Sequence, residues 1–198
     1  MKNNFLELTG RTTDHLTQTK SGDFIHHKVK QPFEQLQKKA KEEINADLQI
    51  VSSFRSFERQ LSIWNAKATG QRSIKNDQGK ILSFDGLSSE LLLRSILRFS
   101  AIPGGSRHHW GSDIDIFDAS VCSKDEVLLE PSECTPGGAF HKLHTWLDDK
   151  IKDNDACGFF RPYNADLGGV AVEKWHLSYR PVSENYNEQY NYEVFIQN

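Results

Sequence analysis

The chain has 198 residues, of which 37% are hydrophobic and 26% charged, and its formal net charge is −3. This composition is that of an ordinary globular protein, which excludes fibrous and disordered classes, and the length suits one domain over residues 1–198. No basic stripe indicates nucleic-acid binding, and no segment has the ~20 apolar residues of a membrane span. Because Met1–Gly10 lacks the apolar core of a signal peptide, we expect a cytoplasmic protein as the sequence stands, or a periplasmic or cell-envelope protein if a signal was removed.

The first third of the chain alternates between helix and strand patterns. Apolar residues recur every three or four positions over Val29–Ala46, with charges on the other face, which predicts an amphipathic helix. Leu48–Ser52 is short, apolar and β-branched, which predicts a buried strand. A second helix is expected over Ser56–Ala68, with Leu61 and Trp64 pointing inward.

The middle of the chain begins with a polar segment, Gln71–Gly86, that we expect to be a loop. A third helix is predicted over Ser89–Ser100, and a Pro-Gly-Gly turn follows it. Polar and apolar residues alternate over Asp113–Phe117, as in a half-buried strand, and Val127–Glu130 is expected to be another strand.

The last third is predicted to contain a helix over Ala139–Ile151, strand segments at Val170–Val172 and Trp175–Tyr179, and a helical tail over Glu184–Phe195. Neither an internal repeat nor a linker divides the chain. The elements together indicate an α+β fold, in which helices pack around a small central sheet.

Two segments, SRHHWGSDID and EKWHLSY, contain residues suited to metal chemistry. His108 follows the Gly-Gly turn and Asp115 lies on the next predicted strand, so their side chains can converge on one point. His176, on a neighbouring strand, would be the third ligand. Two histidines and one aspartate leave zinc an open position for water, whose pKa the metal lowers to ~7. Glu173 is then close enough to accept the proton of that water as a general base.

Each of these residues also has an ordinary structural interpretation. A histidine or aspartate beside a glycine turn commonly caps an element or hydrogen bonds at the surface, Glu173 could be a surface charge, and His176 a hydrogen-bonded core residue. His141 and His144 are three apart on a predicted helix and could bind a metal together, but we favour a helix surface because no partner motif accompanies them. None of the three cysteines forms a C-x-x-C pair, although Cys122 and Cys134 could form a disulfide in an oxidising compartment.

The order of these segments resembles a known family. The pattern S-x-H-x-x-G-x-x-x-D at Ser106–Asp115, followed far downstream by E-x-W-H at Glu173–His176, is similar to the LAS zinc peptidases, which comprise lysostaphin-type enzymes, D-alanyl-D-alanine peptidases and the hedgehog fold. Ser53–Gln60 (SFRSFERQ) resembles the S-x-R-S-x-x-x-Q segment of that group, and the match is closest to VanY-like D-alanyl-D-alanine carboxypeptidases. The resemblance implies a small antiparallel sheet with flanking helices, as in the hedgehog and D,D-peptidase folds.

The resemblance also implies roles for individual residues. His108, Asp115 and His176 would bind Zn²⁺, Glu173 would be the catalytic base, and Arg55 would bind the peptide carbonyl and stabilise the developing oxyanion. The expected substrate-binding residues are Ser53, Gln60, Ser106, Asp113 and Trp175.

Two positions depart from the family pattern. Asp113 stands where the family usually has alanine, and Lys174 stands where it usually has proline. Alternation places Asp113 on the same strand face as Asp115, so Asp113 could support a ligand or alter substrate preference.

The resemblance implies a monomeric carboxypeptidase that hydrolyses the C-terminal D-alanine bond of peptidoglycan stem peptides or muropeptides. Three alternatives stay open: an L,D-carboxypeptidase or D,D-dipeptidase of muropeptide turnover, an endopeptidase that cuts cross-bridges, and a binding module that holds zinc without catalysis.

Overall fold

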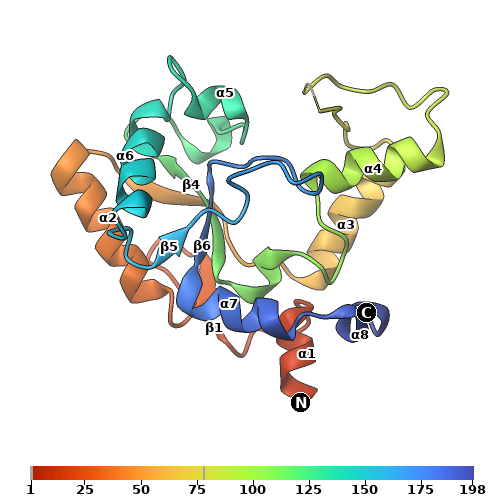
Figure 1. Cartoon of the computed structure of the whole chain (residues 1–198), viewed down its shortest axis with the longest axis horizontal. Helices are drawn as coiled ribbons and strands as arrows, with labels where there is room; N and C mark the ends of the chain where they lie inside the picture. The colour runs from red at the N-terminus through yellow and green to blue at the C-terminus, as the bar shows by residue number, and fades with distance from the viewer. Residues whose placement is uncertain (1, 78) are drawn as a thin grey trace.

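A four-stranded antiparallel sheet lies at the centre of the computed structural model, which describes residues 2–77 and 79–198 (Figure 1). The strand order is β3-β4-β6-β5, and each neighbouring pair is antiparallel. The strands are β3 (Leu48–Ser52), β4 (Asp113–Asp118), β5 (Phe159–Phe160) and β6 (His176–Tyr179). A separate hairpin joins β1 (Leu16–Gln18) to β2 (Phe24–His26). The expected α+β fold with a small antiparallel sheet is confirmed.

Strand β4 is buried along its whole length rather than half-buried as its alternation predicts. Its two isoleucines, Ile114 and Ile116, belong to the apolar core. The opposite face contains Asp113 and Asp115, which are also buried because histidine and arginine side chains cover them. The polar positions of β4 therefore face a polar interior site instead of solvent.

The main core lies between the sheet and two helices, α2 (Lys30–Ile44) and α6 (His141–Lys152), which pack against each other. Both helices fall within their predicted ranges to within two residues. His144 lies on the buried side of α6 with Leu143 and Leu147, so its expected place on the helix surface is wrong. A short helix, α5 (Pro131–Cys134), precedes α6, and the three cysteines are free thiols.

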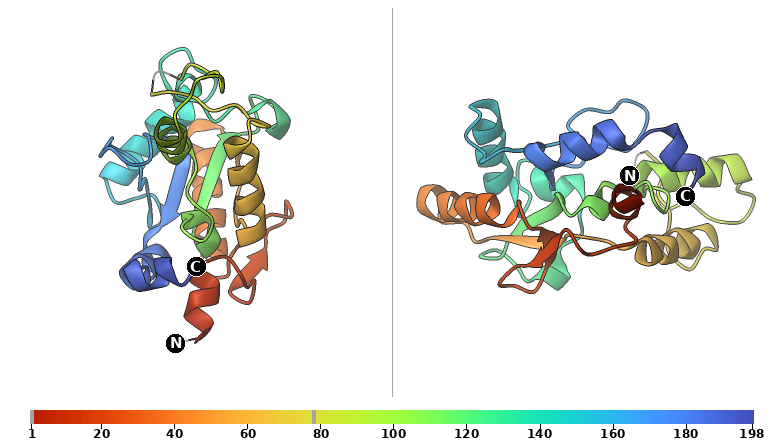
Figure 2. Two further views of the ribbon diagram at one scale, coloured as in Figure 1. Left: turned by 90° about the vertical axis from the view of Figure 1, so that its right-hand side faces the viewer. Right: turned by 90° about the horizontal axis from the view of Figure 1, so that it is seen from below.

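Helices α3 (Phe57–Ala68) and α4 (Ser89–Phe99) pack on each other at the opposite end of the molecule from α2 and α6 (Figures 1 and 2). Ser56 caps α3 by accepting a hydrogen bond from the backbone N–H of Arg59. The expected inward position of Leu61 is wrong, because its side chain is exposed and Gln60 is the buried residue of this helix. The most buried position of α3 is thus occupied by a polar side chain, which apolar periodicity does not detect.

The two ends of the chain meet beside a 3-10 helix, η1 (Arg107–Trp110). Helices α1 (Lys2–Leu8) and α7 (Arg180–Gln189) pack around it, and Trp110 stacks on Tyr186 with ring centroids 5.8 Å apart. The predicted helical tail is therefore divided into α7 and a final helix, α8 (Tyr192–Ile196). None of the helices in the described residues is long and apolar enough to cross a bilayer.

Two predicted strands are wrong. Residues 127–130 follow a short 3-10 helix, η2 (Lys124–Glu126), and Leu129 has a left-handed φ of 54°, which interrupts an extended strand. Residues 170–172 belong to an irregular loop, in which the Ala171 N–H donates to the carbonyl of Arg98 rather than to a strand. This loop leads directly into β6 and forms one wall of the site described next.

Candidate active site

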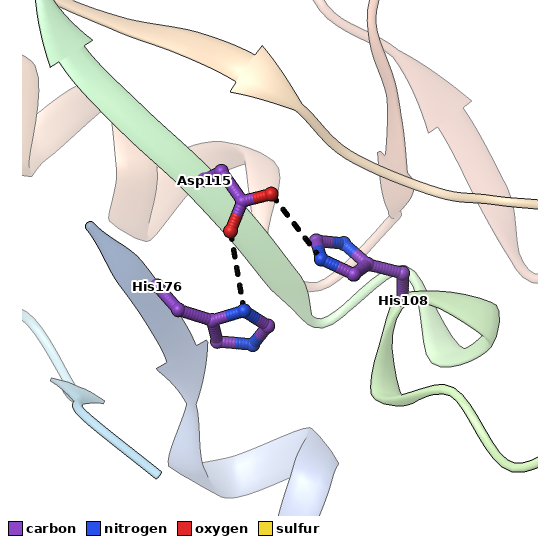
Figure 3. A group of neighbouring side chains, drawn as sticks. All are labelled: His108, Asp115 and His176. Atoms are coloured by element: carbon purple, nitrogen blue, oxygen red, sulfur yellow. Dashed lines mark ion pairs between the residues drawn. The ribbon is translucent and has the colours of Figure 1, made fainter. Parts of the chain in front are cut away.

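Three buried polar side chains from separate segments point toward one another (Figure 3). Asp115 and His176 are direct partners in the register of β4 and β6, and His108 lies in η1, shortly after the Gly-Gly turn. Each residue offers one ligand atom, and these atoms lie within 4.8 Å of one another. Nε2 of His108 is 3.3 Å from Oδ2 of Asp115, and Nδ1 of His176 is 3.2 Å from Oδ1. All three side chains are buried.

Hydrogen bonds on the far side of each imidazole determine which nitrogen faces this centre. Nδ1 of His108 lies 3.0 Å from the carbonyl oxygen of Ser53, which can only accept, so this nitrogen is protonated and Nε2 is free. Nε2 of His176 lies 3.0 Å from Oδ1 of Asp113, which leaves Nδ1 free. Metal-binding histidines are commonly oriented in this way by an acceptor on the second nitrogen.

The cluster fits a metal ion because it contains unsatisfied buried atoms. Oδ1 of Asp115 and Nδ1 of His176 are buried and lie 3.2 Å apart, yet neither makes a hydrogen bond of good geometry with any described residue. An unpaired buried polar atom costs about 1–3 kcal/mol, so such atoms usually indicate a missing partner. Two imidazole nitrogens and one carboxylate form a donor set that zinc accepts while keeping a fourth position open.

Asp113 lies behind His176 and outside the cavity of the site. Its carboxylate accepts from Nε of Arg107 at 2.7 Å and from the hydroxyl of Ser112 at 2.6 Å, besides its contact with His176. Burial by itself raises the pKa of Asp113, but the positive charge of Arg107 and the hydrogen bonds from His176 and Ser112 outweigh it and lower that pKa to about 2. Arg107 also donates to the hydroxyl of Ser178, which fixes the guanidinium against β6.

Glu173 lies beside His176, at the end of the loop before β6. Its Oε2 is 3.5 Å from Nδ1 of His176, and its backbone N–H donates to the carbonyl of Tyr163 at 3.0 Å. Burial opposes the protonation of His176, yet the carboxylates of Asp113, Asp115 and Glu173 around the ring raise its pKa well above the usual range. These three carboxylates form a negative region that favours a cation.

Arg55 follows β3 and points its guanidinium into the same cavity. It donates to Oε1 of Gln60 at 2.8 Å and to the hydroxyl of Ser52 at 3.2 Å. Burial lowers the pKa of Arg55, and the charges of Asp115 and Glu173 oppose that effect. Both terminal nitrogens of the Arg55 guanidinium are therefore held by hydrogen bonds. Gln60 is itself fixed, because its side-chain amide donates to the carbonyl of Ala101.

The cavity has a volume of about 180 Å³. The predicted site residues that line it are Arg55, Ser106, His108, Asp115, Glu173, Trp175 and His176. Ser53, Gln60 and Asp113 are not among its described lining residues and instead support His108, Arg55 and His176. Arg107 and Tyr163 also line the cavity, although neither is among the site residues predicted from the sequence. The need of buried Asp113 for a cation could have indicated Arg107, whereas Tyr163 lies in a loop without a pattern.

Solved structures share this fold. VanYB in complex with D-alanine-D-alanine is 20% identical, with a TM-score of 0.60 over 92% of this chain and 87% of that chain. A variant of the vancomycin resistance D,D-pentapeptidase VanY, from a VanB-type resistance cassette and in complex with Zn(II), is 21% identical, with a TM-score of 0.58 over 93% and 92% of the two chains. The fold is that of the VanY-like D,D-peptidases.

The chain itself belongs to the VanY family, described as D-alanyl-D-alanine carboxypeptidase, because the family model matches residues 22–182. Two uncharacterised proteins of Haemophilus influenzae are more similar in sequence over a shorter range. One is 35% identical over 97 residues, which are 48% of this chain and 73% of that protein. The other is 39% identical over 99 residues, which are 48% of this chain and 67% of that protein.

Proposed function

We propose that this protein is a zinc-dependent carboxypeptidase that hydrolyses the C-terminal D-alanine bond of peptidoglycan stem peptides. The observation that supports the proposal most directly is the pair of buried, unpartnered atoms on Asp115 and His176, which face one point together with His108. Membership of the VanY family supports the substrate class.

His108, Asp115 and His176 would hold the zinc ion, and Glu173 would do the proton chemistry beside it. When bound, zinc acidifies water and polarises a carbonyl group. Glu173 reaches the cavity from the loop before β6, so its carboxylate accepts a proton from the attacking water and returns it to the leaving amine.

Arg55 would stabilise the negative charge that develops on the carbonyl oxygen. Its guanidinium is a permanent donor, and Gln60 and Ser52 fix its orientation before substrate arrives. Ser106 and Trp175 line the cavity and would contact the substrate, whereas Ser53 and Asp113 would act through the two histidines.

Metal analysis and defined muropeptides test the proposal together. The purified protein should contain about one zinc ion per chain, and it should release D-alanine from a pentapeptide that ends in D-alanyl-D-alanine. Glu173→Gln should retain the zinc and lose about 10²–10⁴-fold in kcat, as is typical when a general base is removed. Glu184→Gln, a change of an exposed residue on α7, is the matched control.

The masses of the products distinguish the alternative peptidase activities in the same assay. Release of D-alanine from a tetrapeptide indicates an L,D-carboxypeptidase, release of free D-alanine from D-alanyl-D-alanine indicates a D,D-dipeptidase, and cleavage of cross-linked dimers indicates an endopeptidase. A metal-free protein, or a Glu173→Gln variant with unchanged activity, would overturn the proposed mechanism, and a zinc-loaded wild type that cleaves none of these substrates would favour a module that holds zinc without catalysis.

A further inference from the structure

A second cavity, of about 510 Å³, adjoins the candidate active site on the side of α3. The two cavities share four lining residues: Arg55, Phe99, Ser100 and Leu129. A peptide bound at His108 and Glu173 can therefore extend past Arg55 into this space. The proposed metal site and Glu173 do not account for the residues that line this second cavity.

The wall of the second cavity is strongly basic. Lys67, Arg72 and Lys75 line it together with Arg55, and its lining among the described residues contains no aspartate or glutamate. Lys75 forms an ion pair with Glu130. Arg72 is an exposed residue and forms no ion pair with any residue that the structure describes.

The ammonium of Lys67 has no carboxylate ion-pair partner among the described residues. Its Nζ donates to two neutral oxygens, the hydroxyl of Ser100 at 2.6 Å and the carbonyl of Phe99 at 3.4 Å. Burial, followed by the charges of Arg72 and Arg55, lowers the pKa of Lys67 to about 8. A partly buried ammonium beside other cations is unfavourable without a nearby anion, and an anionic ligand would stabilise it.

Another cavity beside the active site is different in charge. It shares Ala101 and Val170 with the active-site cavity and contains Arg98. There Arg98 is paired with two carboxylates, at 2.6 Å from both Asp77 and Asp166. Lys75 lines this cavity as well as the basic one, and Arg94 in its wall pairs with Glu90. Two carboxylates therefore lie in this lining and none in the described lining on the side of α3, so an anion is favoured on the side of α3.

We propose that Lys67 and Arg72 form a carboxylate-binding subsite for the peptide substrate, next to the catalytic arginine. The inference rests on the proposed peptidase function and adds the location of one anionic group of the peptide, which lies toward α3. Two sources supply such a carboxylate, the C-terminal carboxylate of the substrate and a side-chain or α-carboxylate of the residues before the scissile bond.

Matched peptides distinguish the two sources. One pair of substrates ends in a free acid or an amide, and a second pair contains a carboxylate or a carboxamide before the scissile bond. One of these two pairs contains the carboxylate that binds the subsite. For the acid member of that pair, Lys67→Met and Arg72→Gln should each raise KM about 10–100-fold with little change in kcat. The reason is that a hydrogen bond to a charged group contributes about 1.5–3 kcal/mol. The same variants should leave the amide substrate unaffected.

Three further variants make the result specific. Lys67→Arg keeps the charge and should retain most of the affinity. Lys38→Met removes an exposed lysine of α2 and should change nothing. If Lys67→Met does not fold, the exposed Arg72→Gln decides the matter alone. Equal effects on acid and amide substrates, or no effect on either, would overturn the subsite.

Binding measurements separate this inference from the proposed function. Calorimetric titration of the acid and amide peptides into Glu173→Gln reports binding without turnover. Tight, Lys67-dependent binding of the acid to Glu173→Gln, together with a zinc-loaded wild type that never cleaves it, would remove the peptidase proposal and keep the subsite. Normal cleavage with no dependence on Lys67 or Arg72 would do the reverse.

Discussion

Asp113 and Asp115 lie on opposite sides of the His176 ring, with Oδ1 of Asp113 3.0 Å from Nε2 and Oδ1 of Asp115 3.2 Å from Nδ1. The antiparallel register produces this arrangement, because Asp115 pairs with His176 and Asp113 with Ser178. Both carboxylates of the alternating strand therefore face the same histidine. The first orients the ring, and the second is the proposed co-ligand.

Asp113→Asn should weaken zinc binding by about 10–100-fold, as is typical when the outer partner of a metal-binding histidine is changed. The substitution removes the negative charge that fixes the protonated Nε2 and leaves Arg107 without its ion pair. Competition with a chromophoric chelator measures the affinity. Asp118→Asn, at the end of the same strand and bonded to the N–H of Asp47, is the control. An unchanged affinity of the Asp113 variant would show that the family's alanine position needs no carboxylate here.

Much of the site could be predicted from the sequence because strands have a strict two-residue period. The alternation over residues 113–117 places Asp113 and Asp115 on one face, and that face meets His176. Helix α2 follows apolar periodicity, with Phe33, Leu36 and Ala40 buried. The antiparallel sheet follows from the family resemblance rather than from the alternation itself.

Features that depend on polar partners could not be read from periodicity. Gln60 is buried because it bonds to Arg55 and Ala101, and an apolar pattern assigns that inner position to Leu61 instead. The loop before β6 is held by isolated backbone bonds from Ala171 and Glu173, which leave no local signature. His144 is a different case, since its place beside Leu143 and Leu147 on the helix already indicates the buried face.

Arg55→Lys should lower kcat by about 10²–10³-fold, the usual loss when one oxyanion donor is removed, while zinc content stays the same. A lysine ammonium cannot reproduce the planar fork that bonds Gln60 and Ser52 and still faces the cavity. Steady-state kinetics on a D-alanyl-D-alanine peptide and metal analysis measure the two effects. Arg59→Lys, an exposed change on α3, is the matched control. A purely higher KM would assign Arg55 to ground-state binding instead.

Removal of the metal should lower thermal stability. A ligand present at 100 times its Kd stabilises the folded state by about 2.7 kcal/mol, which corresponds to roughly 5–10 °C in Tm for a chain of this size. Chelation leaves the buried atoms of Asp115 and His176 unpaired again, so the Tm should fall and zinc should restore it. Differential scanning fluorimetry with and without chelator measures the change. His108→Ala should show no response to chelator, and a wild-type Tm that ignores chelator would contradict a bound metal.

His144 should make the protein less stable in acid. Its Nδ1 faces Nη2 of Arg161 at 3.2 Å, and burial, followed by the charges of Arg161 and Lys174, lowers the pKa of His144 to about 3. An unfolded histidine has a pKa of about 6.5, so the unfolded chain binds an additional proton between these two values. The contribution of His144 to stability is therefore complete above about pH 6.5. It decreases by up to about 1.4 kcal/mol for each pH unit below that value, down to the folded pKa.

His144→Asn keeps an acceptor for Arg161 and cannot be protonated, so its free energy of unfolding should depend less steeply on pH between about 6.5 and 4. Urea unfolding of the metal-free protein at several pH values measures the slope, and chelator removes the pH dependence of zinc binding from the comparison. His141→Asn, on the partly exposed side of the same helix, is the matched histidine replacement. If both variants run parallel to the wild type, the acid sensitivity comes from other groups and His144 does not control it.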